Sequence, residues 1–160
     1  MRGLMGYRSD FLTQTKGKGI LTSLFHSYQP HKGEIEGRHN GVLISNSAGQ
    51  ATAYSIFALQ DRGIMFIQPG QEIYEGMVIG EHNRDNDLVV NPVRGKQLTN
   101  VRASGSDENI ILTPPRILNL EQAIDFIEVD ELIEVTPKSI RLRKAELTEN
   151  ERKRRGRNAP

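Results

Sequence analysis

Apolar and polar positions along the first 41 residues predict one helix and one strand before a linker. Ser9 is a good N-terminal cap and glycines follow Thr15, so we expect a short helix between these residues. Alternating side chains over residues 20–28 predict a strand with both faces partly covered. Residues 31–41 are rich in glycine and charge, which is typical of a linker and not of a core.

From residue 42 onward the pattern predicts short strands and helices that do not alternate regularly. Residues 42–44 are apolar throughout, as in a buried strand, and Ala53, Ile56 and Phe57 share one stripe of a helix. This order argues against a doubly wound sheet. We expect an α+β fold with a mostly antiparallel sheet or partial β-barrel and two to three short helices. Further strands are predicted at 64–67, 73–81, 110–112, 132–135 and 139–144, with a type II turn at 68–71 and an irregular segment at 82–109.

The clearest helix is predicted between residues 120 and 128. Asn119, followed three residues later by Gln122, approximates a capping box. Apolar side chains recur at i, i+3, i+4 and i+7, so one stripe of this helix is expected in the core: Leu120, Ala123, Ile124 and Ile127.

Composition excludes several classes of site. The 160 residues include no cysteine, so disulfides, thiolate metal sites and a cysteine nucleophile are all excluded. No apolar stretch approaches the roughly 20 residues that a membrane helix needs. We therefore expect a cytoplasmic chain with no membrane partner.

Nucleotide and metal sites are not predicted either. The two Gly-Lys pairs, at 17–18 and 95–96, have Leu12 and Val90 where a P-loop needs its first glycine. The histidines at 26, 31, 39 and 82 lack the spacing of a zinc helix. We expect no catalytic residue, no metal and no cofactor.

Charge is balanced overall but segregated along the chain. There are 21 Lys and Arg against 20 Asp and Glu, yet residues 121–134 hold six acids and no base, and residues 138–157 hold nine bases and three acids. Thr148 and Glu151 are placed to cap a last basic helix that frays near Gly156. This asymmetry indicates a polyanionic partner, and a solvated basic tail is the alternative.

The segment 82–109 is too long for an ordinary connection and is a candidate RNA-binding loop. Its central part carries bases and amides without acids, a composition that suits phosphate and sugar contacts. A solvated flexible loop is the alternative interpretation. The candidate residues are Arg84, Asn91, Arg94, Lys96, Asn100 and Arg102.

A second basic element is the predicted strand at 139–144. Arg141 and Arg143 share one face of this strand, and Lys144 ends it. We count these three residues as candidate nucleic-acid contacts. Bases that protect an edge strand from aggregation are the alternative.

Seven stretches of the sequence carry a family resemblance. They are residues 2–8, 40–45, 59–63, 74–80, 86–88, 96–105 and 134–144. Together they resemble the BipA/TypA family of ribosome-associated translational GTPases over nearly the whole chain. Residues 1–30, with Phe-His-Ser-Tyr at 25–28, also resemble the second half of the C-terminal α/β domain shared with elongation factor G.

The resemblance implies four regions: that half-domain at 1–30, the linker at 31–41, a BipA-type C-terminal domain at 42–147, and a basic helix and tail at 148–160. Full-length members carry an N-terminal GTPase domain, whose motifs this sequence lacks. Strands of the other half-domain would pair with 20–28, so we expect an unpaired edge and possible weak dimerisation through residues 1–30.

The function implied is a ribosome- and tRNA-binding module for translation or ribosome assembly, with no GTPase activity of its own. Its partners would be ribosomal RNA and the acceptor region of the A-site tRNA. The alternative is a protein-interaction or structural domain whose basic strand and tail bind an acidic protein.

Overall fold

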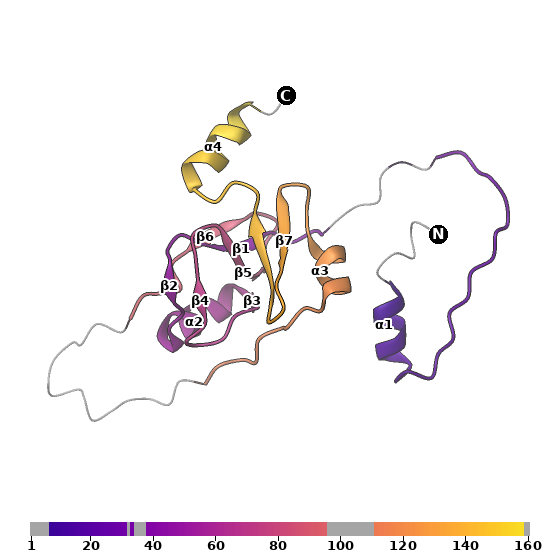
Figure 1. Ribbon diagram of the computed structural model, residues 1–160, viewed down its shortest axis with the longest axis horizontal. Coiled ribbons are helices and arrows are strands. Elements are labelled where there is room, and N and C mark those ends of the chain that lie inside the picture. Colours follow the sequence, from indigo (N-terminus) through magenta and orange to yellow (C-terminus); the bar gives the residue numbers. More distant parts are fainter. Residues whose placement is uncertain (1–6, 32, 34–37, 96–110, 159–160) are drawn as a thin grey trace, which may run out of the picture.

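The computed structural model describes residues 7–31, 33, 38–95 and 111–158. Within them the fold is α+β, built on an open six-stranded sheet and a separate two-stranded one (Figure 1). In chain order the elements are α1 (Tyr7–Gln14), β1 (Val42–Ser45), β2 (Gly49–Gln50), α2 (Ala53–Leu59), the 3-10 turn η2 (Gln60–Arg62), β3 (Gly63–Met65), β4 (Glu72–Ile73), β5 (Met77–His82), β6 (Leu88–Val90), α3 (Leu120–Phe126), β7 (Glu131–Val135), β8 (Ile140–Lys144) and α4 (Glu149–Asn158).

Strand β5 organises the large sheet. It pairs antiparallel with β1 along one edge and with β8 and β3 along the other, and β7 and β8 form an antiparallel hairpin. The strand order is β6-β1-β5-β8-β7, with β3 beside β5. Only the β1–β6 pair among the described strands is parallel. The predicted α+β class with a mostly antiparallel sheet is confirmed, and the described residues form an open sheet.

Successive residues of the central strands supply two separate cores because strand side chains alternate between faces. Leu43 and Ile79 belong to the cluster that includes Ile56 and Leu59 of α2. Val42, Ile44 and Val78 belong to the cluster that includes Ala123 and Phe126 of α3. The sheet is thus covered by a helix on each face, which explains why β1 reads as a continuous apolar run.

Local signals in the sequence set two boundaries correctly. The Asn119 side chain accepts a hydrogen bond from Gln122 N at 2.8 Å, and the Gln122 side chain accepts one from Asn119 N at 3.1 Å, so the capping box is formed. In the turn at 68–71, Gln71 N donates to Gln68 O at 3.2 Å and Gly70 has a φ of +80°, which an L side chain rarely adopts.

The predicted core stripe of the 120–128 helix is wrong at two of its four positions. Ala123 is fully buried and Ile127 is half-buried, but Leu120 is 43% and Ile124 57% exposed. Phe126 takes their place in the core and packs edge-to-face on Phe66, with ring centroids 5.2 Å apart. The helix has only seven residues, and the two of them that are buried against the sheet are Ala123 and Phe126. Phe57 of α2, also predicted on a buried stripe, is 45% exposed.

The predicted strand at 20–28 is absent, and this segment has no regular secondary structure. Its apolar side chains are exposed, among them Ile20 at 86% and Leu24 at 93%. Figure 1 shows the segment following α1 as extended chain apart from the sheet. A strand needs backbone hydrogen bonds from a neighbouring strand, and no strand of the described residues pairs with this segment.

Other predicted boundaries also need correction. The segment predicted as irregular at 82–109 contains β6, which adds to the sheet beside β1. The single strand predicted at 73–81 is two strands, β4 and β5, and residues 111–112 form no strand. Helix α4 continues past Gly156 to Asn158. In the described part of the chain, no helix has the length and apolar character needed to span a membrane.

Candidate nucleic-acid interface

The first part of the 82–109 segment presents polar side chains on an anchored backbone. Arg84, Asn91 and Arg94 are all exposed. The carbonyl of Arg84 accepts a hydrogen bond from Gly41 N at 2.7 Å, and that of Arg94 accepts one from Thr52 Oγ1 at 2.7 Å. Their guanidinium groups are therefore free to meet solvent from fixed points of the backbone. Lys96, Asn100 and Arg102 lie outside the described residues.

The bases of β8 differ sharply from one another. Arg143 Nε lies 2.9 Å from Glu134 Oε1, an ion pair whose N–H is not aligned as a hydrogen bond. Arg141 is half-buried, and its Nε has no hydrogen-bond partner among the described residues. Lys144 is 2% exposed. The shared face that the sequence predicts for Arg141 and Arg143 holds, because Leu142 between them is in the core.

Lys144 belongs to an ionic cluster that joins four segments of the chain and is buried at Lys144 and Glu131. Its Nζ lies 2.6 Å from Asp87 Oδ2, 3.0 Å from Asp130 Oδ2 and 2.9 Å from Glu131 Oε1. Arg38 contacts the same Glu131 at 2.8 Å and stacks over the Phe126 ring, 4.4 Å from its centroid. Arg38 lies within the predicted linker, so the end of that segment is fixed to the domain.

The cluster shifts the pKa values of Glu131 and Lys144 toward their charged forms. Burial by itself would raise the pKa of Glu131, but hydrogen bonds from Arg38 and Lys144 outweigh it and hold the pKa below its ordinary value. Burial would lower the pKa of Lys144, and its carboxylate partners raise it instead. The ammonium is thus committed to carboxylates, and we leave Lys144 out of the proposed RNA surface.

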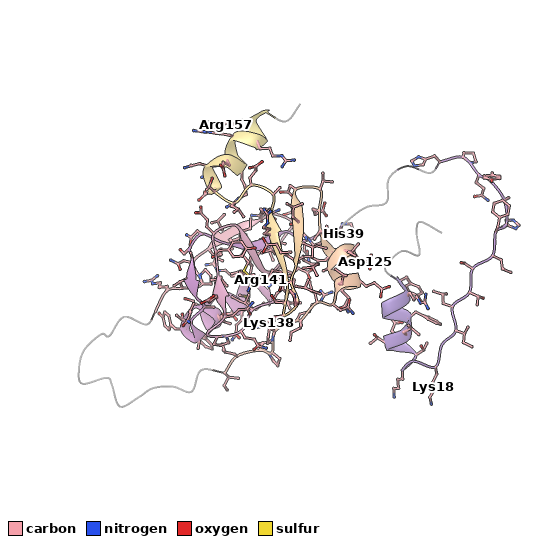
Figure 2. The ribbon with its side chains drawn as sticks, viewed as in Figure 1. Lys18, His39, Asp125, Lys138, Arg141 and Arg157 are labelled. Atoms are coloured by element: carbon pink, nitrogen blue, oxygen red, sulfur yellow. The ribbon has the colours of Figure 1, made fainter. Side chains whose placement is uncertain are left out.

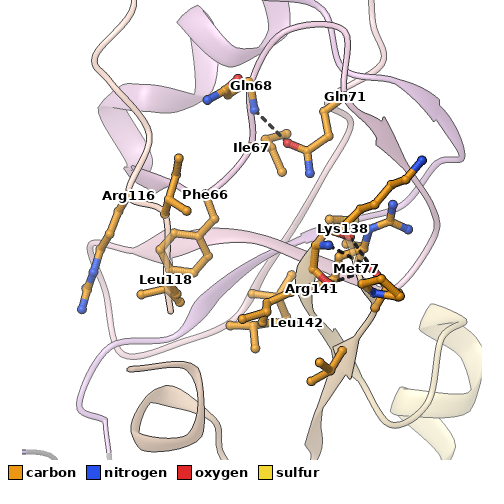
Figure 3. Close-up of a pocket in the computed structure, with 17 residues that line it drawn as sticks. Phe66, Ile67, Gln68, Gln71, Met77, Arg116, Leu118, Lys138, Arg141 and Leu142 are labelled. Carbon is orange, nitrogen blue, oxygen red and sulfur yellow. Dashed lines mark hydrogen bonds between the residues drawn. The ribbon is translucent and has the colours of Figure 1, made fainter. Parts of the chain in front are cut away.

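An open groove of about 680 Å³ lies beside Arg141. Its walls come from residues 66–68, 71, 77–78, 116–118 and 135–142, the last of these forming the tip of the β7–β8 hairpin. Figure 3 shows Lys138 and Arg141 on one side and Arg116 on the other, with Phe66 and Leu118 between them. On the whole molecule, Lys138 and Arg141 share one region of the body, whereas Arg157 projects from α4 (Figure 2).

Sequence reasoning missed Lys138 and Arg116 as parts of this surface. Arg116 is separated from the β7–β8 hairpin by α3, and only the folded chain brings the two together. Its guanidinium also pairs with Glu81, 3.1 Å away. The available signal for Lys138 was its position beside Pro137 in the hairpin turn, three residues before Arg141.

Comparison with known proteins places this arrangement in a family. The family described as TypA/BipA C-terminal domain matches residues 40–149, which spans the sheet, both cores and the groove. The chain belongs to the TypA/BipA family. The predicted family resemblance is therefore confirmed.

Several curated TypA/BipA relatives are similar over almost the whole chain. A protein named large ribosomal subunit assembly factor BipA from Salmonella typhimurium is 57% identical over 157 residues, 98% of this chain. Its namesakes are 56% identical in Escherichia coli strain K12, over the same share, and 51% identical over 96% of the chain in Bacillus subtilis. The chain spans about a quarter of the length of these relatives, 26%, 26% and 25% respectively.

Proposed function

We propose that this chain is a ribosome-binding module that contacts RNA through the 82–109 segment and meets the acceptor region of an A-site tRNA. The relatives named as large ribosomal subunit assembly factors support a role on the ribosome, in translation or in assembly. The observation that carries the RNA contact is Arg94, which is exposed while its backbone is held by Thr52 and Ser55. A cation on an anchored backbone neutralises phosphate without reading sequence.

The same proposal covers organisation and chemistry. Residues 1–30 would be half of an α/β domain, 31–41 a linker, 42–147 the BipA-type domain, and 148–160 a basic helix and tail. We propose a cytoplasmic chain that has no GTPase activity of its own and uses no cofactor. Nucleotide turnover would belong to other parts of the full-length family members.

Ribosome co-sedimentation at low and high salt tests the proposal. The parent chain should sediment with ribosomes at low salt and dissociate as salt rises, because each neutralised phosphate releases counterions. Replacing Arg94 and Lys96 by Ala should leave folding unchanged, weaken binding and lower the log–log salt slope by about two. No sedimentation of the parent at low salt would overturn the proposal.

The double variant Arg141→Ala and Arg143→Ala is the matched comparison, since it also removes two bases. If it abolishes ribosome binding while the Arg94 and Lys96 variant binds with the parent slope, β8 carries recognition and the loop assignment is wrong.

A protein-interaction domain is the second candidate, and α4 favours it. Its exposed bases at 153–155 and 157 would attract an acidic protein as readily as a phosphate backbone. Binding without RNA separates the two candidates, because an acidic protein supplies its own negative charge. If the chain binds an acidic protein in the absence of RNA, that result would favour this alternative.

A further inference from the structure

The groove beside β8 combines one sign of charge with an apolar floor. Three of its lining residues are cations, Lys138, Arg141 and Arg116, and none of its described lining residues is an acid. Phe66 and Leu118 lie on the floor between those cations (Figure 3). At about 680 Å³, the groove is within the range of roughly 300–1,000 Å³ typical of ligand sites.

Arg141 keeps its charge available to a ligand. Glu134 lies opposite Arg141 in the β7–β8 register and is the nearest candidate to neutralise it. Both Glu134 oxygens have other partners, however: Oε1 pairs with Arg143 at 2.9 Å, and Oε2 accepts the Tyr74 hydroxyl at 2.6 Å. The Nε of Arg141 also has no hydrogen-bond partner among the described residues, so no described carboxylate neutralises the Arg141 guanidinium.

Amide groups supply a third kind of contact at the groove. Gln68 and Gln71 both line it, and Gln71 Oε1 accepts a hydrogen bond from Gln68 N at 3.1 Å. The Gln71 side chain is thereby oriented with its NH₂ group still able to donate. Amide donors and acceptors match the edges of nucleobases.

We infer that the groove holds one unpaired nucleotide of a single-stranded RNA, with its phosphate at Lys138 and Arg141 and its base against Phe66, Ile117 and Leu118. This inference rests on the proposed RNA-binding function and names the ligand of a surface distinct from the 82–109 segment. An acidic peptide would match the cations, but a carboxylate side chain has no flat apolar body to cover the floor. An unstacked nucleotide has both an anion and such a body.

Fluorescence anisotropy of a labelled hexauridylate with the 160-residue chain tests the phosphate contact. Arg141→Gln should weaken binding and reduce the log–log salt slope by about 0.7, the value for one phosphate of a single strand. Arg62→Gln is the matched control, since Arg62 is exposed and is not among the residues that line the groove. Equal effects of the two variants would overturn the inference.

An abasic hexamer with the same phosphates tests the base contact. It should bind the parent at least about fivefold more weakly than hexauridylate, because base stacking is lost. Ile117→Ser, at a groove residue that is 74% exposed, should narrow that difference, and Val129→Ser, 96% exposed outside the groove, should not. Equal affinity of the two hexamers for the parent would overturn the inference.

The outcomes also separate this inference from the proposed function. If the chain binds ribosomes but no single-stranded RNA, only the groove assignment fails. The groove assignment also fails if a poly-glutamate peptide displaces hexauridylate as effectively as an unlabelled hexamer does, and if that displacement depends on Arg141. If the chain binds no ribosome at low salt, the proposed function fails. If hexauridylate still binds and the Arg141→Gln and Ile117→Ser variants change that binding as expected, the nucleotide site in the groove would then still be supported.

Discussion

Ala123 shows how the burial of a small residue decides which substitutions a helix position tolerates. It has no exposed surface and lies among Val42, Val78 and Leu142, whereas its neighbour Ile124 is 57% exposed. The apolar period of α3 cannot distinguish these two positions, because both fall on the predicted stripe.

We predict that Ala123→Asp destabilises the domain by about 3 kcal/mol or more, because it buries a charge among apolar side chains. Ile124→Asp is the matched control and should change stability by no more than about 0.5 kcal/mol. Urea unfolding of both variants measures the difference. Similar midpoints for the two would mean that Ala123 is not buried.

Glu131 is a second residue whose surroundings decide how much it contributes to stability. Its side chain has no exposed surface and lies between Arg38 and Lys144. We predict that Glu131→Gln costs about 3 kcal/mol, because it removes the carboxylate that the two buried cations share. Urea midpoints at neutral pH measure this cost, and a neutral effect would contradict it.

The depressed pKa of Glu131 also predicts a pH dependence. Between the lower folded pKa and the ordinary value of 4.5, the unfolded chain binds more protons, so the contribution of Glu131 is present above that window and is lost as the pH falls through it. The parent should therefore lose more stability than Glu131→Gln on acidification below about pH 4.5. Parallel stability curves for the two proteins would refute this assignment.

At the scale of elements, Asp87 holds three strands together. Its Oδ1 accepts a hydrogen bond from Val42 N of β1 at 2.9 Å, its Oδ2 pairs with Lys144 of β8, and the residue directly precedes β6. The parallel β1–β6 pair is short, so this side chain supplies much of what fixes its end.

We predict that Asp87→Ala destabilises the domain by about 1–3 kcal/mol, because the buried Val42 N–H and the Lys144 ammonium both lose a partner. Asp85→Ala, at an exposed position of the same turn, should be nearly silent. Amide hydrogen exchange should show faster opening of β1 and β6 in the Asp87 variant. Unchanged exchange in β1 and β6 would contradict the role of Asp87 in holding these strands.

At the scale of the whole molecule, the exposed apolar side chains of 20–28 favour association. Leu24 and Phe25 are 93% and 75% exposed. We predict weak, concentration-dependent self-association in sedimentation velocity, because burying these side chains removes apolar surface from water. Replacing both by Ser should reduce it, and Val129→Ser should not. A monomer at all concentrations would refute the prediction.

We also predict that the chain alone gives no saturable GTP binding at micromolar concentration by calorimetry. The sequence contains no P-loop, and that motif supplies the backbone donors that hold the phosphates. Saturable binding would overturn both this prediction and the domain organisation proposed above.

The sequence by itself determined the elements with strong local causes. The capping box at Asn119, the type II turn at Gly70 and the apolar run of β1 depend on neighbours along the chain, so local patterns predict them. The family resemblance likewise rests on local motifs, and the match over 40–149 confirms it.

Tertiary structure decided what depends on contacts between distant segments. Which face of α3 is buried follows from where β1, β5 and β8 place their apolar side chains, and β6 is a strand because β1 lies beside it. Lys144 and Arg141 are both bases of one strand, yet the fold gives Lys144 three carboxylates and gives Arg141 Nε no hydrogen-bond partner among the described residues. Burial and charge pairing are long-range properties, which no periodicity along the chain encodes.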